Sequence, residues 1–168
     1  FWILLSLLFP KKEHNNKLLY NSSIFLFFIV VLQIIYGAFV AGLDAGKIYN
    51  TWPKMHEQWI AESVYAMTPV WSNFVNGLAG VQFIHRWLAY IVLAIVIFMF
   101  FKSRNFNLSK IEVNAINRVS IVVFLQVVLG IITLIYGVPI WLGVIHQLGA
   151  FLLLAATVFC LFIFKKTT

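Results

Sequence analysis

Four long apolar stretches constrain the fold of this chain more than any other feature. No charged residue occurs between Lys17 and Asp44, and three further stretches are nearly as apolar. About 20 apolar residues suffice for one membrane-spanning helix. Inside lipid a chain must be helical, because no water is there to bond its peptide groups. The sequence therefore predicts an all-α polytopic membrane protein, a four-helix transmembrane bundle with spans at 18–43, 73–101, 119–137 and 140–164.

The composition excludes the other structural classes. Hydrophobic residues make up 62% of the chain and charged residues only 10%, whereas soluble domains carry about 25% charged residues. Disorder requires low hydrophobicity and high charge, which is the opposite balance. The single cysteine, Cys160, leaves no disulfide to be formed within the chain. We interpret it as a small apolar residue of the last span.

The first nine residues form a shorter apolar run. Residues 1–9 cannot cross a bilayer as a helix, and the chain begins with Phe1 rather than Met. We predict a fragment, in which 1–9 is the end of a truncated transmembrane helix and 18–164 is a four-helix unit.

The basic residues predict the orientation of the spans. The formal net charge of +7 would suggest nucleic acid as a partner of a soluble protein, but here the charges lie in loops between apolar runs. Lys and Arg gather in 11–17, in 102–118 and at the C-terminal tail, whereas the loop 44–72 is nearly balanced. Since basic loops stay on the cytoplasmic side, we predict that 44–72 faces outward, and we expect no nucleic acid partner.

Two halves of the sequence resemble one another. The segment LQIIYG at 32–37 matches LQVVLG at 125–130, and His85 and His146 begin similar apolar patterns in the second and fourth spans. The repeat predicts two similar helical hairpins related by an axis along the membrane normal. Such an axis places His85 and His146 at equal depth, where they could face each other across the bundle.

A pair of intramembrane histidines suggests a haem site. Ionisable residues inside a membrane are costly and usually functional, and facing helices of a bundle often build cofactor sites. Two neutral imidazoles at one depth suit the two axial positions of a haem iron. Zinc would need about four ligands, and no second Cys or carboxylate lies near either histidine in sequence. Alternatively, each histidine could simply hydrogen-bond to a neighbouring helix.

Other residues of the spans could also contribute to such a site or to packing. Arg86 adjoins His85 and is a candidate partner for haem propionates, although it could instead extend to water or to lipid phosphate. We expect Gln33 and Gln126 to be interhelical hydrogen-bond donors. Asp44 could hold a proton or influence a neighbouring group, or could cap the end of a span. The residues that could accommodate a macrocycle are aromatic or glycine: Phe83, Trp87, Tyr90, Phe151, Gly143 and Gly149.

The longer motifs resemble the haem A synthase family. GAFVAGLDAG at 37–46 followed by YNTWP at 49–53 is similar to its alphaproteobacterial and mitochondrial branch, as are VQFIHR at 81–86 and GVIHQ at 143–147. The resemblance covers about 17–164. It implies an eight-helix enzyme with two similar four-helix halves. That enzyme oxidises the C8 methyl of haem O to a formyl group with oxygen from water, giving haem A for cytochrome oxidase biogenesis.

The resemblance assigns this chain to the C-terminal half. On that basis 18–164 is a haem-binding half that holds a haem b, with its iron axially ligated by His85 and His146, and that passes electrons. No catalytic residue can be named, because the other half carries its own histidine pair and a carboxylate. We expect the fragment alone to be inactive as an oxidoreductase.

The resemblance also implies partners and a location. Expected partners are haem O as substrate, membrane lipid, an unidentified electron acceptor, and haem O synthase or a second copy of the chain. The expected location is the bacterial inner membrane, with the mitochondrial inner membrane as the alternative. Two other functions fit the same residues: a b-type cytochrome that carries electrons without catalysis, and a membrane protein without a cofactor.

Overall fold

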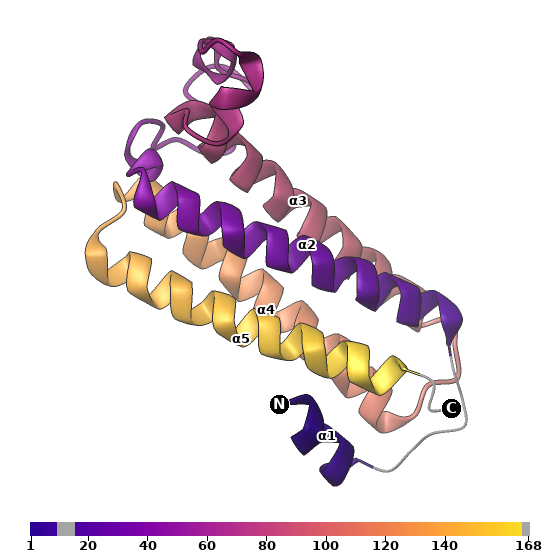
Figure 1. The fold of residues 1–168 in the computed structure, drawn as a ribbon. Coiled ribbons are helices and arrows are strands. Elements are labelled where there is room, and N and C mark those ends of the chain that lie inside the picture. The colour runs from indigo at the N-terminus through magenta and orange to yellow at the C-terminus, as the bar shows by residue number, and fades with distance from the viewer. Residues whose placement is uncertain (10–15, 166–168) are drawn as a thin grey trace.

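The computed structural model describes residues 1–9 and 16–165, and its long elements are all helices. Four of them run antiparallel side by side (Figure 1), and each is long and apolar enough to cross a membrane. They are α2 (Lys17–Gly42), α3 (Leu78–Ser103), α4 (Lys110–Ile135) and α5 (Ile140–Phe164). No β-strand occurs among the described residues, apart from an isolated bridge between Met55 and Gln58. The predicted all-α, four-helix architecture is confirmed.

The four helices close into a ring. Helix α2 packs against α3, α3 against α4, α4 against α5, and α5 against α2. Helices α3 and α5 therefore stand diagonally opposite each other. A short helix, α1 (Trp2–Leu8), lies beside the C-terminal end of α5 (Figure 1). There Trp2 packs edge-on against Phe162 at 5.1 Å between ring centroids.

Two helices begin at residues other than the expected span boundaries. Helix α4 starts at Lys110, well before residue 119, because Ser109 and Glu112 form a capping box. The Glu112 carboxylate accepts hydrogen bonds from the backbone N–H of Ser109 at 2.7 Å and from its hydroxyl at 2.6 Å. Such a box satisfies N–H groups at a helix start, so the helix can begin in a polar segment. Helix α3 starts at Leu78 rather than at 73, because Val70–Phe74 forms a separate 3₁₀ helix.

The buried core occupies one half of the bundle, the half farther from the loop between α2 and α3. It includes Leu26 and Val30 of α2, Val96 and Met99 of α3, Val119 and Val123 of α4, and Phe159 and Cys160 of α5. Cys160 is fully buried there, and its sulfur lies 3.6 Å from the Ser23 hydroxyl oxygen. This placement fits its interpretation as a small core residue.

Residues 44–77 form the outer loop, which has a small core of its own. Three 3₁₀ helices shape it: η1 (Ala45–Lys47), η2 (Glu62–Tyr65) and η3 (Val70–Phe74). Met55, Ala61 and Val64 are buried together with Ala79 of α3, and the loop stands above the start of α3 (Figure 1). The segment is therefore folded onto the end of the bundle.

The charged residues of the connections agree with the proposed orientation. Lys102, Arg104 and Lys110 lie at the end of the bundle opposite the outer loop. Residues 11–15 of the first basic segment, and Lys166 of the tail, lie outside the described residues. The inside and outside assignment of the two ends stays a prediction.

Cysteine labelling tests this orientation. Tyr136 lies in the α4–α5 turn and is 73% exposed, and Asn105 is exposed in the α3–α4 connection. In intact cells, a membrane-impermeant maleimide should label Tyr136→Cys and spare Asn105→Cys, because only the first lies outside. The unmodified chain is the control, since its one cysteine, Cys160, is buried. Labelling of Asn105→Cys alone would reverse the orientation.

Candidate functional site

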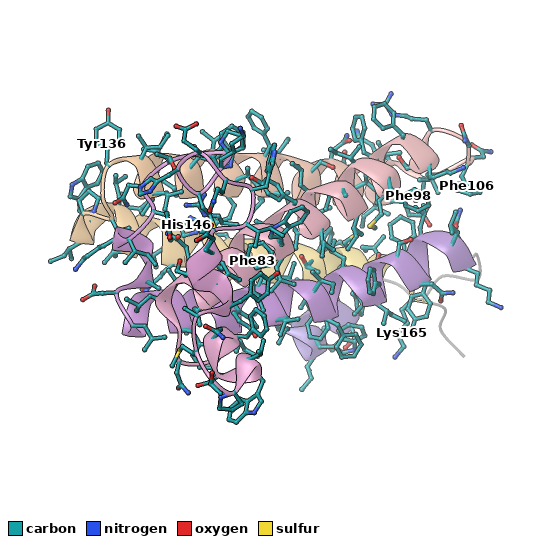
Figure 2. All side chains as sticks on the ribbon, turned by 90° about the horizontal axis from the view of Figure 1, so that it is seen from above. Phe83, Phe98, Phe106, Tyr136, His146 and Lys165 are labelled. Carbon is teal, nitrogen blue, oxygen red and sulfur yellow. The ribbon has the colours of Figure 1, made fainter. Side chains whose placement is uncertain are left out.

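The two histidines lie on the diagonally opposed helices. His85 is on α3 and His146 is on α5, and each is about two turns from the start of its helix. Figure 2 shows His146 towards the end of the bundle that Tyr136 marks, away from Phe106 and Lys165. The structure thus places both candidates at the same end of the bundle.

His85 packs against two residues of α2. Nε2 of the Gln33 amide lies 3.3 Å from Nε2 of His85, so the amide N–H donates to the ring when His85 carries its proton on Nδ1. Gly37 follows Gln33 by one helical turn and therefore lies on the same face of α2. A Cβ on Gly37 would lie only 3.2 Å from His85 Cε1.

His146 packs against α4 in a corresponding way. The Gln126 amide donates to the His146 carbonyl oxygen at 2.8 Å. Gly130, one turn after Gln126, meets the ring, and a Cβ there would lie 2.9 Å from His146 Cε1. The sequence repeat is thus also a structural repeat, with Gln and Gly on the first helix of each hairpin and His on the second. The prediction that Gln33 and Gln126 bond across helices is confirmed.

Several polar atoms of this site have no partner. Nδ1 of His85, Nδ1 of His146 and Oε1 of Gln33 are buried without a hydrogen-bond partner in the described part of the chain. Leaving a buried polar atom unpaired costs about 1–3 kcal/mol, so such atoms call for an explanation, and a ligand is one. Each histidine therefore has a buried ring nitrogen whose hydrogen-bonding capacity the described residues do not satisfy.

Packing around the histidines is less complete than in the core. No residue in 31–42, 124–132 or 143–152 is fully buried, although these stretches belong to three of the four bundle helices. The described residues contain no cluster of three or more His, Cys, Asp or Glu that could hold a metal ion. The donor set is therefore two imidazoles, which suits a group that supplies its own equatorial ligands, as haem does.

Arg86 holds the outer loop. Its guanidinium donates to the carbonyl oxygens of Tyr49 at 2.6 Å, Thr51 at 2.8 Å and Lys54 at 3.1 Å. The Gln82 amide also donates to the Tyr49 carbonyl, at 3.1 Å. These hydrogen bonds satisfy the positive charge of Arg86 within an apolar helix. Neither of the two interpretations drawn from the sequence, a propionate partner or extension to water or lipid, included the loop carbonyls. Nε of Arg86 has no partner among the described residues, and a role toward propionates stays a prediction.

The outer loop also contacts the second hairpin. The Asn50 amide donates to the carbonyl oxygens of Gly46 at 2.8 Å and of Leu134, near the end of α4, at 2.9 Å. A Cβ on Gly46 would lie 2.7 Å from Cγ2 of Val138, so the close approach of the two segments requires glycine. Arg86 and Asn50 thus tie the loop to both hairpins.

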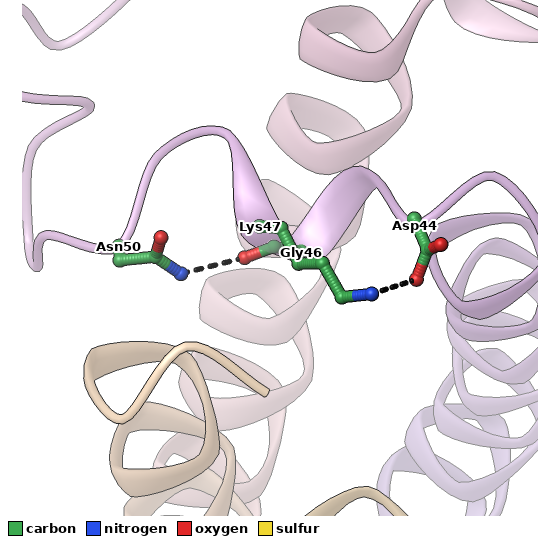
Figure 3. Close-up of polar contacts among 4 residues, drawn as sticks. All are labelled: Asp44, Gly46, Lys47 and Asn50. Atoms are coloured by element: carbon green, nitrogen blue, oxygen red, sulfur yellow. Dashed lines mark hydrogen bonds and ion pairs between the residues drawn. The ribbon is translucent and has the colours of Figure 1, made fainter. Parts of the chain in front are cut away.

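Asp44 has an exposed side chain at the start of the outer loop. Its carboxylate pairs with Lys47 at 2.7 Å (Figure 3), and the Asp44 side chain is 73% exposed. Asp44 also has a left-handed backbone, with φ 55°. It caps η1 by position but makes no side-chain cap hydrogen bond.

The residues suggested as surroundings of a macrocycle are divided among different places. Phe83 packs against the small core of the outer loop, and the Tyr90 hydroxyl donates to the Pro53 carbonyl at 3.5 Å. Trp87 and Phe151 are exposed. Gly149 contacts the Gln126 amide, whereas Gly143 has open space beside it. The glycines that meet the rings, Gly37 and Gly130, were noticed in sequence only as members of the repeat.

Fold and site define a polytopic helical membrane protein with a pair of imidazoles between two repeated hairpins. A family model described as cytochrome oxidase assembly protein, COX15-CtaA, matches residues 1–158. The chain belongs to this family, and it is an integral membrane protein. No solved structure gives a significant match.

Curated relatives carry the name heme A synthase. The chain is 46% identical over 167 residues to that of Flavobacterium psychrophilum, covering 98% of this chain and 49% of the relative. Identity is 36% to that of Wolbachia pipientis wMel and 37% to that of Parvibaculum lavamentivorans; each match covers 94% of this chain and 44% of the relative. The resemblance found in the motifs is confirmed, and the chain spans about half the length of the curated relatives it matches.

Removing the Arg86 guanidinium should free the outer loop. In Arg86→Leu three loop carbonyls lose a charged donor, and hydrogen bonds to charged groups contribute about 1.5–3 kcal/mol each. We expect faster trypsin cleavage after Lys47 and Lys54, measured by mass spectrometry of the detergent-solubilised protein. Arg104→Leu, at the other end of α3, is the control and should not change this cleavage. Equal cleavage of Arg86→Leu and the unmodified protein would show that Arg86 does not hold the loop.

Proposed function

We propose that this chain is the bis-histidine haem-binding half of a haem A synthase. Three observations support the proposal: membership of the cytochrome oxidase assembly family, relatives named heme A synthase of about twice the length, and the histidine pair on diagonal helices. The observation that carries it is that Nδ1 of both histidines is buried and unpartnered.

The residues of the site fit a haem. His85 and His146 would provide one axial ligand each, so that the group would join the two hairpins. When bound, the haem iron supplies one-electron oxidation and reduction. The outer loop, held by Arg86 and Asn50, would limit access of water from the outer side. Arg86 would in addition place a positive charge near the anionic propionates.

The proposed activity belongs to the complete protein. Converting the C8 methyl of haem O into a formyl group adds an oxygen from water and releases protons and electrons, which an acceptor must take up. We assign this half to haem b binding and electron transfer, and we assign the methyl oxidation to the half outside this chain. The partners are then haem O, an electron acceptor and membrane lipid, and the location is the inner membrane.

Histidine substitutions in the complete protein test the haem assignment. His85→Ala or His146→Ala should each abolish a low-spin haem b signal in the reduced-minus-oxidised absorption spectrum, because either change leaves one axial position without its ligand. His56→Ala is the control, since His56 lies in the outer loop against Tyr49. A low-spin haem b signal of unchanged intensity per protein in both variants would show that other residues are the ligands. A folded protein that binds no haem would refute the proposed function.

Haem O conversion separates the enzyme from a simple electron carrier. The complete protein supplied with haem O should yield haem A, detected by chromatography of extracted haems, and His146→Ala should reduce the yield. A protein with normal haem b and no conversion under any electron acceptor would instead be a b-type cytochrome.

A further inference from the structure

We propose that Gly37 and Gly130 are positioning residues that fix the orientation of the two imidazole rings. The inference rests on the proposed function, because it treats His85 and His146 as ligands. It goes beyond that function by assigning a role to two residues that are not themselves ligands.

The geometry is the same in both hairpins. In each, the carbon between the two ring nitrogens, Cε1, is the atom nearest to the glycine position. A Cβ would lie 3.2 Å from that carbon at Gly37 and 2.9 Å at Gly130, and ordinary contacts of a Cβ are 3.4–4 Å. Both rings therefore rest with the same edge against helix backbone that lacks a side chain.

The glutamine of the first hairpin contacts the histidine ring itself, whereas the glutamine of the second hairpin contacts the histidine backbone. Gln33 approaches Nε2 of His85, and Gln126 holds the backbone of His146 through its carbonyl. Nδ1 has no hydrogen-bond partner in either ring among the described residues, and it lies on the edge that faces the glycine, 3.7 Å from the Cβ position at Gly37 and 3.6 Å from that at Gly130. A ring bounded on this edge by helix backbone cannot turn toward that helix, so its orientation is restricted before a ligand arrives.

Helix preference alone does not explain these two glycines. Alanine is more favourable than glycine inside a helix, and both positions are in helix interiors. The chain offers a helical glycine as a comparison, because a Cβ on Gly42 would meet no described atom within 4 Å beyond the backbone of its own helix. Alanine at Gly42 adds the same methyl group without touching a ring.

The test compares three variants of the complete protein: Gly37→Ala, Gly130→Ala and the control Gly42→Ala. The readouts are the amount of haem b retained, the low-spin electron paramagnetic resonance signal, and the midpoint potential. Support for orienting residues around a ligand typically changes affinity by about 10–100-fold. We expect Gly130→Ala to lose most haem or to shift the low-spin signal, Gly37→Ala to do so less, and Gly42→Ala to match the unmodified protein.

The outcomes separate this inference from the proposed function. If the unmodified protein shows no histidine-dependent haem, the proposed function fails. If it does, and Gly130→Ala and Gly37→Ala match the Gly42→Ala control in haem content, signal and potential, the positioning role is overturned. Should Gly130→Ala fail to fold, as judged by size-exclusion chromatography in detergent, Gly37→Ala decides, because its methyl needs a smaller shift of the ring. A folded Gly37→Ala with an unchanged signal and potential would then overturn the inference.

Discussion

A peptide group inside a bilayer has no water to bond, and this constraint governs how the chain can be built. It makes every span a helix, and it makes each polar side chain within a span costly unless a partner is near. In this bundle, Gln33, Gln126 and the two histidines are gathered at one end. The opposite end holds the buried core, where Ser23 and Thr157 satisfy their hydroxyls with carbonyl groups of their own helices. At the histidine end, Nδ1 of both rings is unpaired among the described residues.

The outer loop depends on the same constraint. Its carbonyl groups at 49, 51 and 54 receive the Arg86 guanidinium, and this pairing satisfies a charge that would otherwise be isolated in an apolar helix. Asn50 joins the loop to the end of α4. One segment therefore covers the end of both hairpins, and the residue that holds it adjoins the histidine of α3. A group bound at His85, as we propose, would therefore lie beside the residue that fixes the position of the loop.

The sequence predicts the four spans from the length of the apolar stretches. It predicts the repeat, and the interhelical role of the two glutamines, from residues that match between the two halves. The contacts of Arg86 could not be predicted from the sequence, because every residue has a backbone carbonyl. Only the fold of the loop determines which carbonyls face α3. The early start of α4 had a signal, Ser109 followed by Glu112 three residues later, which apolar length alone overlooks. The contacts of Gly37 and Gly130 were also indicated, because each follows its glutamine by four residues. That these glycines contact the histidine rings could be recognised only once the structure showed which helix each histidine faces.

The central claim is that His85 and His146, from two repeated hairpins, hold one haem between them. A single-particle electron microscopy map of the complete protein tests this most directly. The account predicts density for one flat macrocycle between α3 and α5, continuous with both imidazoles and enclosed on the outer side by the loop that Arg86 holds. A map in which side chains fill that space, with both histidines bonded only to protein or lipid, would contradict it.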